Sequence, residues 1–152
     1  MFQQMRRLDR QMSKEDTIKA LEGAVDGILG TISENGYPYA VPVNFAYVNG
    51  KIYLHNAFEG HKVKNIKNNE LVSFTVVTRN EVLEDKFSTN YQSVIVFGKA
   101  KLIEPSKEIL MYLIKKYSSK FMEKGQNYVN SDYMKTQLIE IEIDHMTGKE
   151  RK

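Results

Sequence analysis

The residues best suited to chemistry lie between Tyr53 and Lys67, where a short apolar run is followed by a glycine and a lysine-rich segment. Asn49-Gly50 favours a two-residue hairpin turn, so a strand is expected after it. From His61 the spacing is helical, because Val63 and Ile66 share one face. The first turn of a helix presents free backbone N–H groups and a positive dipole end, so this order suits an anion such as phosphate. A solvated surface helix has the same pattern.

Lys62 would add a mobile positive charge to that turn, and His61 and Lys67 are the next candidates for a phosphate contact. His55, near the end of the preceding strand, could face a ligand or pack within the sheet. The spacing of His55, His61 and His145 matches no metal-binding motif, so no metal site is expected. The chain also lacks a P-loop, a dinucleotide fingerprint and a hydrolase nucleophile elbow.

Composition narrows the classes of function. The 152 residues, 41% of them hydrophobic, are enough for one domain with its own core. The absence of cysteine excludes disulfides, thiolate metal sites and cysteine nucleophiles, so redox chemistry would need a bound cofactor. Without a long apolar run or a secretion signal, a soluble cytoplasmic protein with no membrane partner is expected. The net charge of +3 is spread among 19 acidic residues, so no nucleic-acid partner is expected.

Hydrophobic periodicity and turn signals predict three helices and six strands in a single domain over residues 1–152. The predicted helices are 14–22, 61–68 and 107–117, and the predicted strands are 27–33, 37–48, 51–57, 71–77, 91–103 and 137–143. Residues 1–12 should form a surface arm and 13–23 the N-terminal helix with its cap. Residues 78–89 read as a polar excursion, and 118–131 as a polar, mobile segment.

The first three strands should form an antiparallel meander of two hairpins. Pro38 and Pro42 lack N–H groups, which places the second strand at an edge or a bend. Gly98 predicts a bulge or a close approach of another backbone. Six antiparallel strands favour a small β-barrel, with an open α+β sheet as the alternative.

Several segments resemble the flavin-binding split barrels related to pyridoxamine phosphate oxidase, especially the Nim branch associated with 5-nitroimidazole reduction and resistance. These segments are 5–12 (MRRLDRQM), 36–45 (GYPYAVPVNF), 52–62 (IYLHNAFEGHK) and 90–100 (NYQSVIVFGKA), followed by 141–149 (IEIDHMTGK). Together they cover nearly the whole chain in order. The resemblance implies a six-stranded split barrel and a homodimer with FMN, or alternatively FAD, in a groove between the subunits.

The resemblance also implies roles for particular residues. The flavin ring would lie near 42–44 (Pro42, Val43 and Asn44), and Gly60, His61 and Lys62 would hold the phosphate. The remaining predicted contacts are His55, Asn56, Ala57, Lys67, Tyr91 and Phe97, with His55 as the candidate catalytic residue. Relatives with oxidase activity carry several arginines around the phosphate, which this chain replaces with His61, Lys62 and Lys67.

The expected function is an FMN-dependent oxidoreductase that passes electrons from NADH or NADPH to a small acceptor, such as a nitroaromatic. The alternative is a non-catalytic carrier of flavin or haem with the same fold, because His55 has no obvious carboxylate partner in the sequence. A nucleic-acid-binding barrel is a third interpretation, which would need aromatic residues interleaved with a basic stripe.

Overall fold

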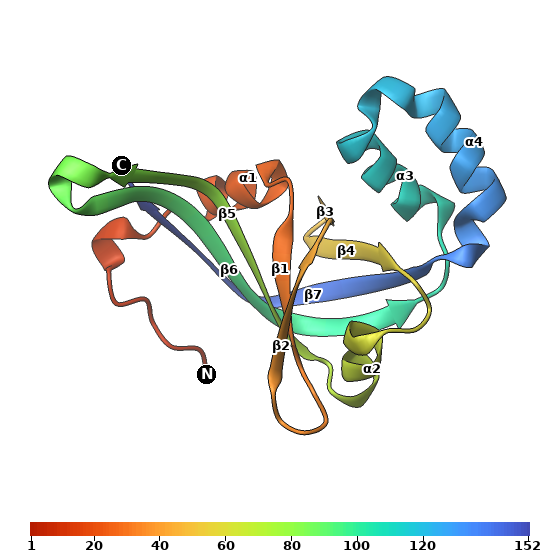
Figure 1. Cartoon of the computed structure of the whole chain (residues 1–152), viewed down its shortest axis with the longest axis horizontal. Coiled ribbons are helices and arrows are strands. Elements are labelled where there is room, and N and C mark those ends of the chain that lie inside the picture. The colour runs from red at the N-terminus through yellow and green to blue at the C-terminus, as the bar shows by residue number, and fades with distance from the viewer.

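The computed structural model describes residues 1–152. Its strands form one antiparallel sheet in the order β2-β1-β5-β6-β7-β4-β3, with helices against its surfaces (Figure 1). The strands are β1 (Gly27–Ile32), β2 (Pro38–Val43), β3 (Ala46–Val48), β4 (Lys51–Asn56), β5 (Leu71–Leu83), β6 (Ser88–Ile103) and β7 (Gln137–Arg151). The α-helices are α1 (Lys14–Gly23), α2 (His61–Asn68), α3 (Lys107–Tyr117) and α4 (Met122–Asp132). Short 3-10 helices are η1 (Leu8–Arg10), η2 (Glu84–Lys86), η3 (Ser119–Phe121) and η4 (Tyr133–Lys135).

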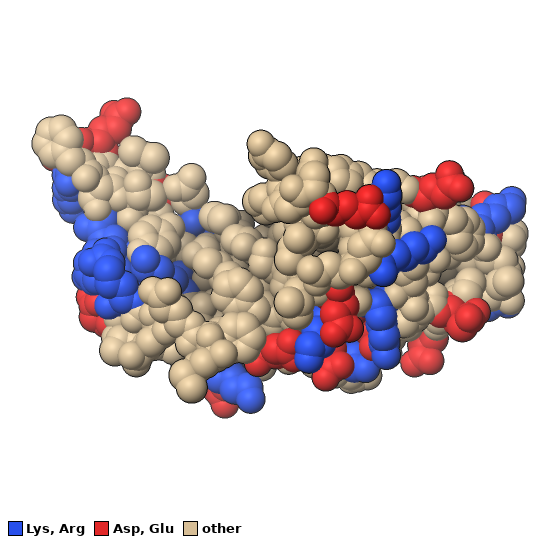
Figure 2. All heavy atoms as spheres, turned by 90° about the horizontal axis from the view of Figure 1, so that it is seen from below, with Lys and Arg blue, Asp and Glu red and all other residues tan.

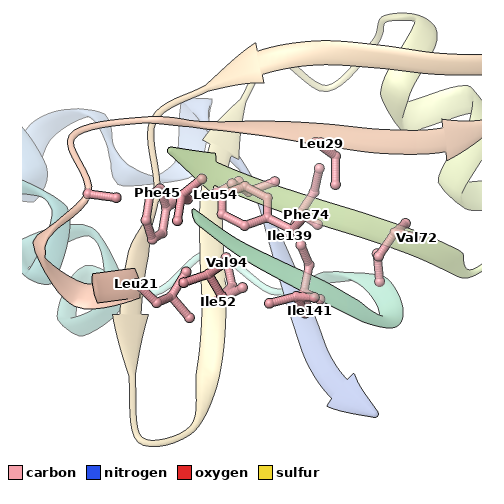
Figure 3. Close-up of a cluster of buried hydrophobic side chains, with 14 of the residues drawn as sticks. Leu21, Leu29, Phe45, Ile52, Leu54, Val72, Phe74, Val94, Ile139 and Ile141 are labelled. Atoms are coloured by element: carbon pink, nitrogen blue, oxygen red, sulfur yellow. The ribbon is translucent and has the colours of Figure 1, made fainter. Parts of the chain in front are cut away.

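One hydrophobic core fills the inside of the curled sheet. Its side chains come from five strands and from α1 and α2, and Figure 3 shows many of them turned toward one another. They include Leu21, Leu29, Ile52, Leu54, Ile66, Val72, Phe74, Val76, Val94, Val96, Ile139 and Ile141. The edge strands β2 and β3 do not pair with each other, so the barrel is not closed by hydrogen bonds. The predicted β-barrel is therefore confirmed as a split barrel.

The predicted second strand, 37–48, is wrong in its continuity. The chain leaves β2 at Val43, passes through Asn44 and Phe45, and starts β3 at Ala46 on the opposite edge of the sheet. The sheet consequently has seven strands instead of six, and the predicted meander is replaced by two hairpins at separate edges. Pro38 and Pro42 do lie on an edge strand, as predicted, where a missing N–H costs no ladder bond to a second neighbour.

The predicted polar excursion at 78–89 is also wrong. These residues extend β5 and β6 into a long hairpin that closes at η2, with Phe87 in the left-handed conformation at φ 49°. The last strand, predicted to end at Ile143, continues beside this hairpin to Arg151. The resulting three-stranded arm projects at the left of Figure 1. Most of its side chains are at least partly solvent-exposed, so it carries no apolar periodicity in the sequence.

The segment predicted as mobile, 118–131, instead contains η3 and α4. Helix α4 packs against α3 because Gly125 lets the two backbones approach over Ile114, and because Val129 is buried beside Leu113. A serine cap starts α1, where Ser13 Oγ accepts a hydrogen bond of 3.1 Å from Asp16 N, as predicted. No helix of the chain combines the length and apolar character that a membrane crossing requires.

Candidate functional site

The N-terminus of α2 presents backbone donors that the helix does not use. Gly60 is the N-cap at φ 146°, a conformation that favours glycine, and it has no side chain with which to cap the helix. The first backbone bond of the helix runs from Lys64 N to Gly60 O at 3.0 Å, so the N–H groups of residues 61–63 have no helical acceptor. The first turn holds no acidic residue. This helix end can therefore accept an anion.

Two lysines of α2, one in its first turn and one in its last, carry unneutralised charge. None of the ion pairs in the chain includes Lys62 or Lys67, whereas Lys64 lies 3.6 Å from Glu34. A groove of about 550 Å³ lies over the helix start, lined by Phe58, Glu59, Gly60, His61, Val63, Lys64 and Lys67. The groove therefore offers a ligand the free N–H groups of the first turn and the unpaired charge of Lys67.

The side chain of His61 contacts the β1–β2 hairpin. A hydrogen bond of 3.0 Å joins its Nε2 to Ser33 Oγ, and its ring lies 3.9 Å from the Tyr39 ring between centroids. These side chains line a second groove, of about 320 Å³, together with Asn65 and Lys64. Because neighbouring helical residues point about 100° apart, His61 and Lys62 face different sides of α2.

The buried side chain of Asn65 hydrogen-bonds to residues beside that groove and so positions them. Its buried side-chain amide donates to Thr31 Oγ1 at 3.0 Å and to Ser33 Oγ at 3.2 Å, and Ser33 in turn meets His61. Sequence reasoning missed Ser33 and Asn65. The signal that could have identified Asn65 is its position four residues after His61, on the same helical face.

His55 ends the outward-facing row of β4, close to Lys62. Its side chain is exposed at the strand end, yet desolvation by the surrounding protein, followed by the charge of Lys62, lowers the pKa of His55. The imidazole is therefore held in its neutral form more strongly than a free histidine. It can offer one donor and one acceptor to a ligand.

Asn56, next to His55, contains an orphaned polar atom. Its Nδ2 donates to Ala57 O at 2.6 Å, while its buried Oδ1 has no hydrogen-bond partner. A buried acceptor without a partner is costly, so the position suits a ligand hydroxyl or N–H. The ribityl hydroxyls and the ring N–H of a flavin are donors of this kind, and the residues present thus fit such a cofactor.

The remaining predicted contacts lie elsewhere on the protomer. Pro42 is exposed on β2 opposite Ile28, Val43 packs against the core, and Asn44 is exposed in the crossover. Phe97 is on the outer face of β6. The structure therefore brings together the residues of 55–67, and leaves those of β2 and β6 on separate strands.

Tyr91 belongs to a basic cluster at the base of the arm. Arg10 Nη1 donates to Tyr91 Oη at 3.3 Å, and Lys149 Nζ lies 5.6 Å from the tyrosine ring centroid. Desolvation raises the pKa of Tyr91, but the hydrogen bonds and charges of Arg10 and Lys149 outweigh it and lower the pKa overall. Figure 2 shows lysine and arginine side chains gathered at the arm end of the molecule. The neighbouring Asn90 also has a buried Oδ1 without a partner.

The curled but unclosed sheet, with a helix N-terminus after β4, places the chain in the split-barrel class of folds. The chain belongs to the pyridoxamine 5'-phosphate oxidase family, whose model matches residues 13–150. The family predicted from the sequence is therefore confirmed. None of the curated protein sequences matches this chain.

Solved structures share the fold at low sequence identity. A candidate 5-nitroimidazole antibiotic resistance protein from Bacteroides thetaiotaomicron is 23% identical, with a TM-score of 0.66 and coverage of 91% of this chain and 85% of the other. A conserved hypothetical protein from Mycobacterium tuberculosis is 19% identical, with a TM-score of 0.82 and coverage of 97% and 90%. An FAD-binding protein from Mesorhizobium loti is 21% identical, with a TM-score of 0.65 and coverage of 94% and 98%.

Proposed function

We propose that the protein is an FMN-dependent oxidoreductase that carries electrons from NADH or NADPH to a small acceptor, such as a 5-nitroimidazole. The observation that carries the proposal is the start of α2. The first turn has free backbone N–H groups and the unpaired Lys62, Lys67 borders the groove over it, and Asn56, with its orphaned Oδ1, ends the preceding strand. A phosphate at the helix end and a ribityl chain beside Asn56 would satisfy these groups together. The likeness to a candidate nitroimidazole resistance protein supports the choice of acceptor.

The flavin, when bound, supplies the hydride and electron chemistry, and the protein supplies position and electrostatics. The N–H groups of the first turn, Lys62 and Lys67 would bind the phosphate. His55, as a neutral imidazole, would hydrogen-bond to a polar edge of the cofactor. Pro42, Val43 and Asn44 lie apart from residues 55–67 within one protomer, so they would border the ring only in a site shared between two subunits. Desolvation, and then the nearby charge of Lys62, lower the pKa of His55, so its ring nitrogen remains able to accept a proton or a hydrogen bond.

Lys62→Ala is expected to weaken FMN binding about ten- to a hundredfold, because a charge-assisted hydrogen bond is worth about 1.5–3 kcal/mol. Riboflavin has no phosphate, so its affinity should barely change. Titration of both flavins into wild type and variant, followed by flavin absorbance and fluorescence, measures the difference.

Lys19→Ala, an exposed lysine on α1, serves as the matched control for net charge and should leave both affinities unchanged. Equal losses of FMN and riboflavin in Lys62→Ala would assign Lys62 to the fold or the ring pocket. No loss for either flavin would remove the phosphate from this helix end. A wild-type protein that takes up neither FMN nor FAD would refute the function as a whole.

The outer face of the sheet supports a homodimer with the cofactor between subunits. Ile28 on β1, Val77 on β5 and Ile95 on β6 are exposed there, and their strands are neighbours. Burial of such a surface about a two-fold axis would create two equivalent clefts. Within one protomer Tyr91 lies on the arm and His61 on α2, and a partner subunit could bring these two groups to one cofactor.

Light scattering at micromolar concentration should therefore give twice the 17.6 kDa monomer mass. Ile95→Glu should shift the protein toward monomers, because it places a charge within the apolar surface. Val25→Glu changes an exposed valine after α1 and should not alter the mass. A wild-type mass of one monomer would contradict both the dimer and the intersubunit site.

A non-catalytic carrier of flavin or haem is the second candidate function. The observation that favours it is that His55 makes no hydrogen bond or ion pair with a carboxylate, so the site shows no acid–base pair. Steady oxidation of NADPH by a nitro compound in the presence of the loaded protein would exclude a carrier role. Flavin binding without turnover would favour it.

A further inference from the structure

Three aromatic rings from distant parts of the chain lie nearly parallel on the outer face of the sheet. The Phe2 ring lies 4.7 Å from the His145 ring at an interplanar angle of 6°, and 5.5 Å from the Phe97 ring at 14°. The rings of Phe97 and His145 are themselves 6.5 Å apart at 18°. Phe97 and His145 thus form a flat base that is about two rings wide, and Phe2 covers it.

A β-bulge places the two rings of this base side by side. Phe97 is paired with His145, but the next residue, Gly98, is paired with Ile143, so Asp144 is the extra residue on β7. Without the bulge, Phe97 would face Asp144 and no second ring. Bulges that re-aim side chains are common next to ligand sites. The side chain of His145 makes no hydrogen bond or ion pair, and its aromatic contacts are with Phe2 and Phe97.

The segment that carries Phe2 is only loosely held. Residues 1–6 belong to no helix or strand, and they make no backbone hydrogen bond. Figure 1 shows this segment running back from η1 toward the middle of the molecule. Phe2 itself remains 45% exposed, and it precedes the residues that the family model matches. Its stacking contacts can therefore be exchanged for those of another ring at small cost to the fold.

We propose that Phe97 and His145 form a seat for a planar, electron-poor aromatic ring, and that Phe2 occupies this seat until such a ring displaces it. The face of a phenylalanine ring carries partial negative charge, so it stacks best on a ring whose electrons have been withdrawn, as a nitro group does. The seat lies on the same outer face of the sheet as the proposed dimer surface. Binding of such a ring to the seat does not require the flavin. Only its reduction rests on the proposed function.

Equilibrium dialysis of the full-length protein, with and without FMN, tests the seat with 4-nitrobenzyl alcohol as the probe. Phe2→Ala removes the competing ring and should tighten the probe roughly two- to tenfold, the range expected for one aromatic pair. Phe97→Ala and His145→Ala should each weaken it by a similar factor. Benzyl alcohol, which lacks the nitro group, should bind more weakly to all of these proteins.

The proposal predicts tighter probe binding in Phe2→Ala and weaker binding in Phe97→Ala and His145→Ala. Nonspecific binding to an apolar surface predicts weaker or unchanged binding in every variant. Lys62→Ala should leave the probe affinity unaltered, so failure of the flavin site and failure of the ring seat give different patterns. Weaker binding in Phe2→Ala, unchanged binding in Phe97→Ala and His145→Ala, or equal affinity for benzyl alcohol would each overturn the proposal. Circular dichroism checks that each variant keeps its fold.

Discussion

Phe45→Ala is expected to lower the free energy of unfolding by about 3–5 kcal/mol, the usual range for removal of a buried phenylalanine side chain. Phe45 is fully buried in the crossover between β2 and β3, and its ring meets the Phe74 ring edge-on at 4.8 Å. Two side chains of helix α3 also contact Phe45. Lys116 Nζ lies 3.6 Å from the ring centroid and donates to Phe45 O at 2.9 Å, and Tyr117 Oη accepts from Phe45 N at 3.0 Å.

Chemical denaturation followed by circular dichroism measures this loss. Phe87→Ala is the matched control, because Phe87 is 96% exposed at the tip of the arm and its truncation should change stability by no more than about 0.5 kcal/mol. Burial lowers the pKa of Lys116 to about 8, which agrees with a side chain enclosed by the crossover. Similar stabilities for the two variants would show that the crossover is not fixed by Phe45.

Gly98→Ala should lower the free energy of unfolding by about 3 kcal/mol, at the upper end of the cost of overpacking. A Cβ at this position would collide with the backbone oxygen of Glu142, which the sheet cannot move without breaking the bulge. For a chain of this size the loss corresponds to a fall in melting temperature of about 6–12 °C. Thermal unfolding followed by circular dichroism measures it.

The same substitution at Gly23 provides the comparison. Gly23 ends α1 with no atom within 4 Å of an added Cβ, so Gly23→Ala should leave stability unchanged or raise it by up to about 1 kcal/mol. If Gly98→Ala were as stable as wild type, the close approach of β6 and β7 at this position would not be required for the stability of the fold. The base of the aromatic seat depends on the same bulge.

Elements marked by local signals could be predicted from the sequence. Helix α2 spans the predicted residues, because Gly60 interrupts the strand and the apolar spacing of Val63 and Ile66 is unambiguous. The break at Asn44 and Phe45 could not be found in this way, since neither glycine nor proline occupies either position. The transfer of the chain to the opposite sheet edge is decided by burial of Phe45 in the core, which is a tertiary effect.

In the candidate site, too, residues with local sequence signals could be predicted, and residues brought together only by the fold could not. Lys62 was predicted beside a helix end because both features are adjacent in sequence. Ser33 meets His61 across 28 residues and Tyr91 meets Arg10 across 81, and no spacing rule connects such pairs. Phe2, which lies outside every predicted element, could not be placed over Phe97 and His145 before the path of the N-terminal segment was known.

The three-stranded arm divides the chain into regions of unequal resistance to local opening. Beyond Val77 the side chains of β5 are almost all exposed, so backbone hydrogen bonds hold the arm without an apolar layer on either side. Phe74 and Val96, in contrast, belong to the buried core. Amide protons of the arm can therefore exchange with solvent through openings that cost little free energy, while those near Phe74 must wait for unfolding of the whole barrel. The basic cluster around Tyr91, at the base of this arm, is thus carried by the part of the sheet that opens most readily.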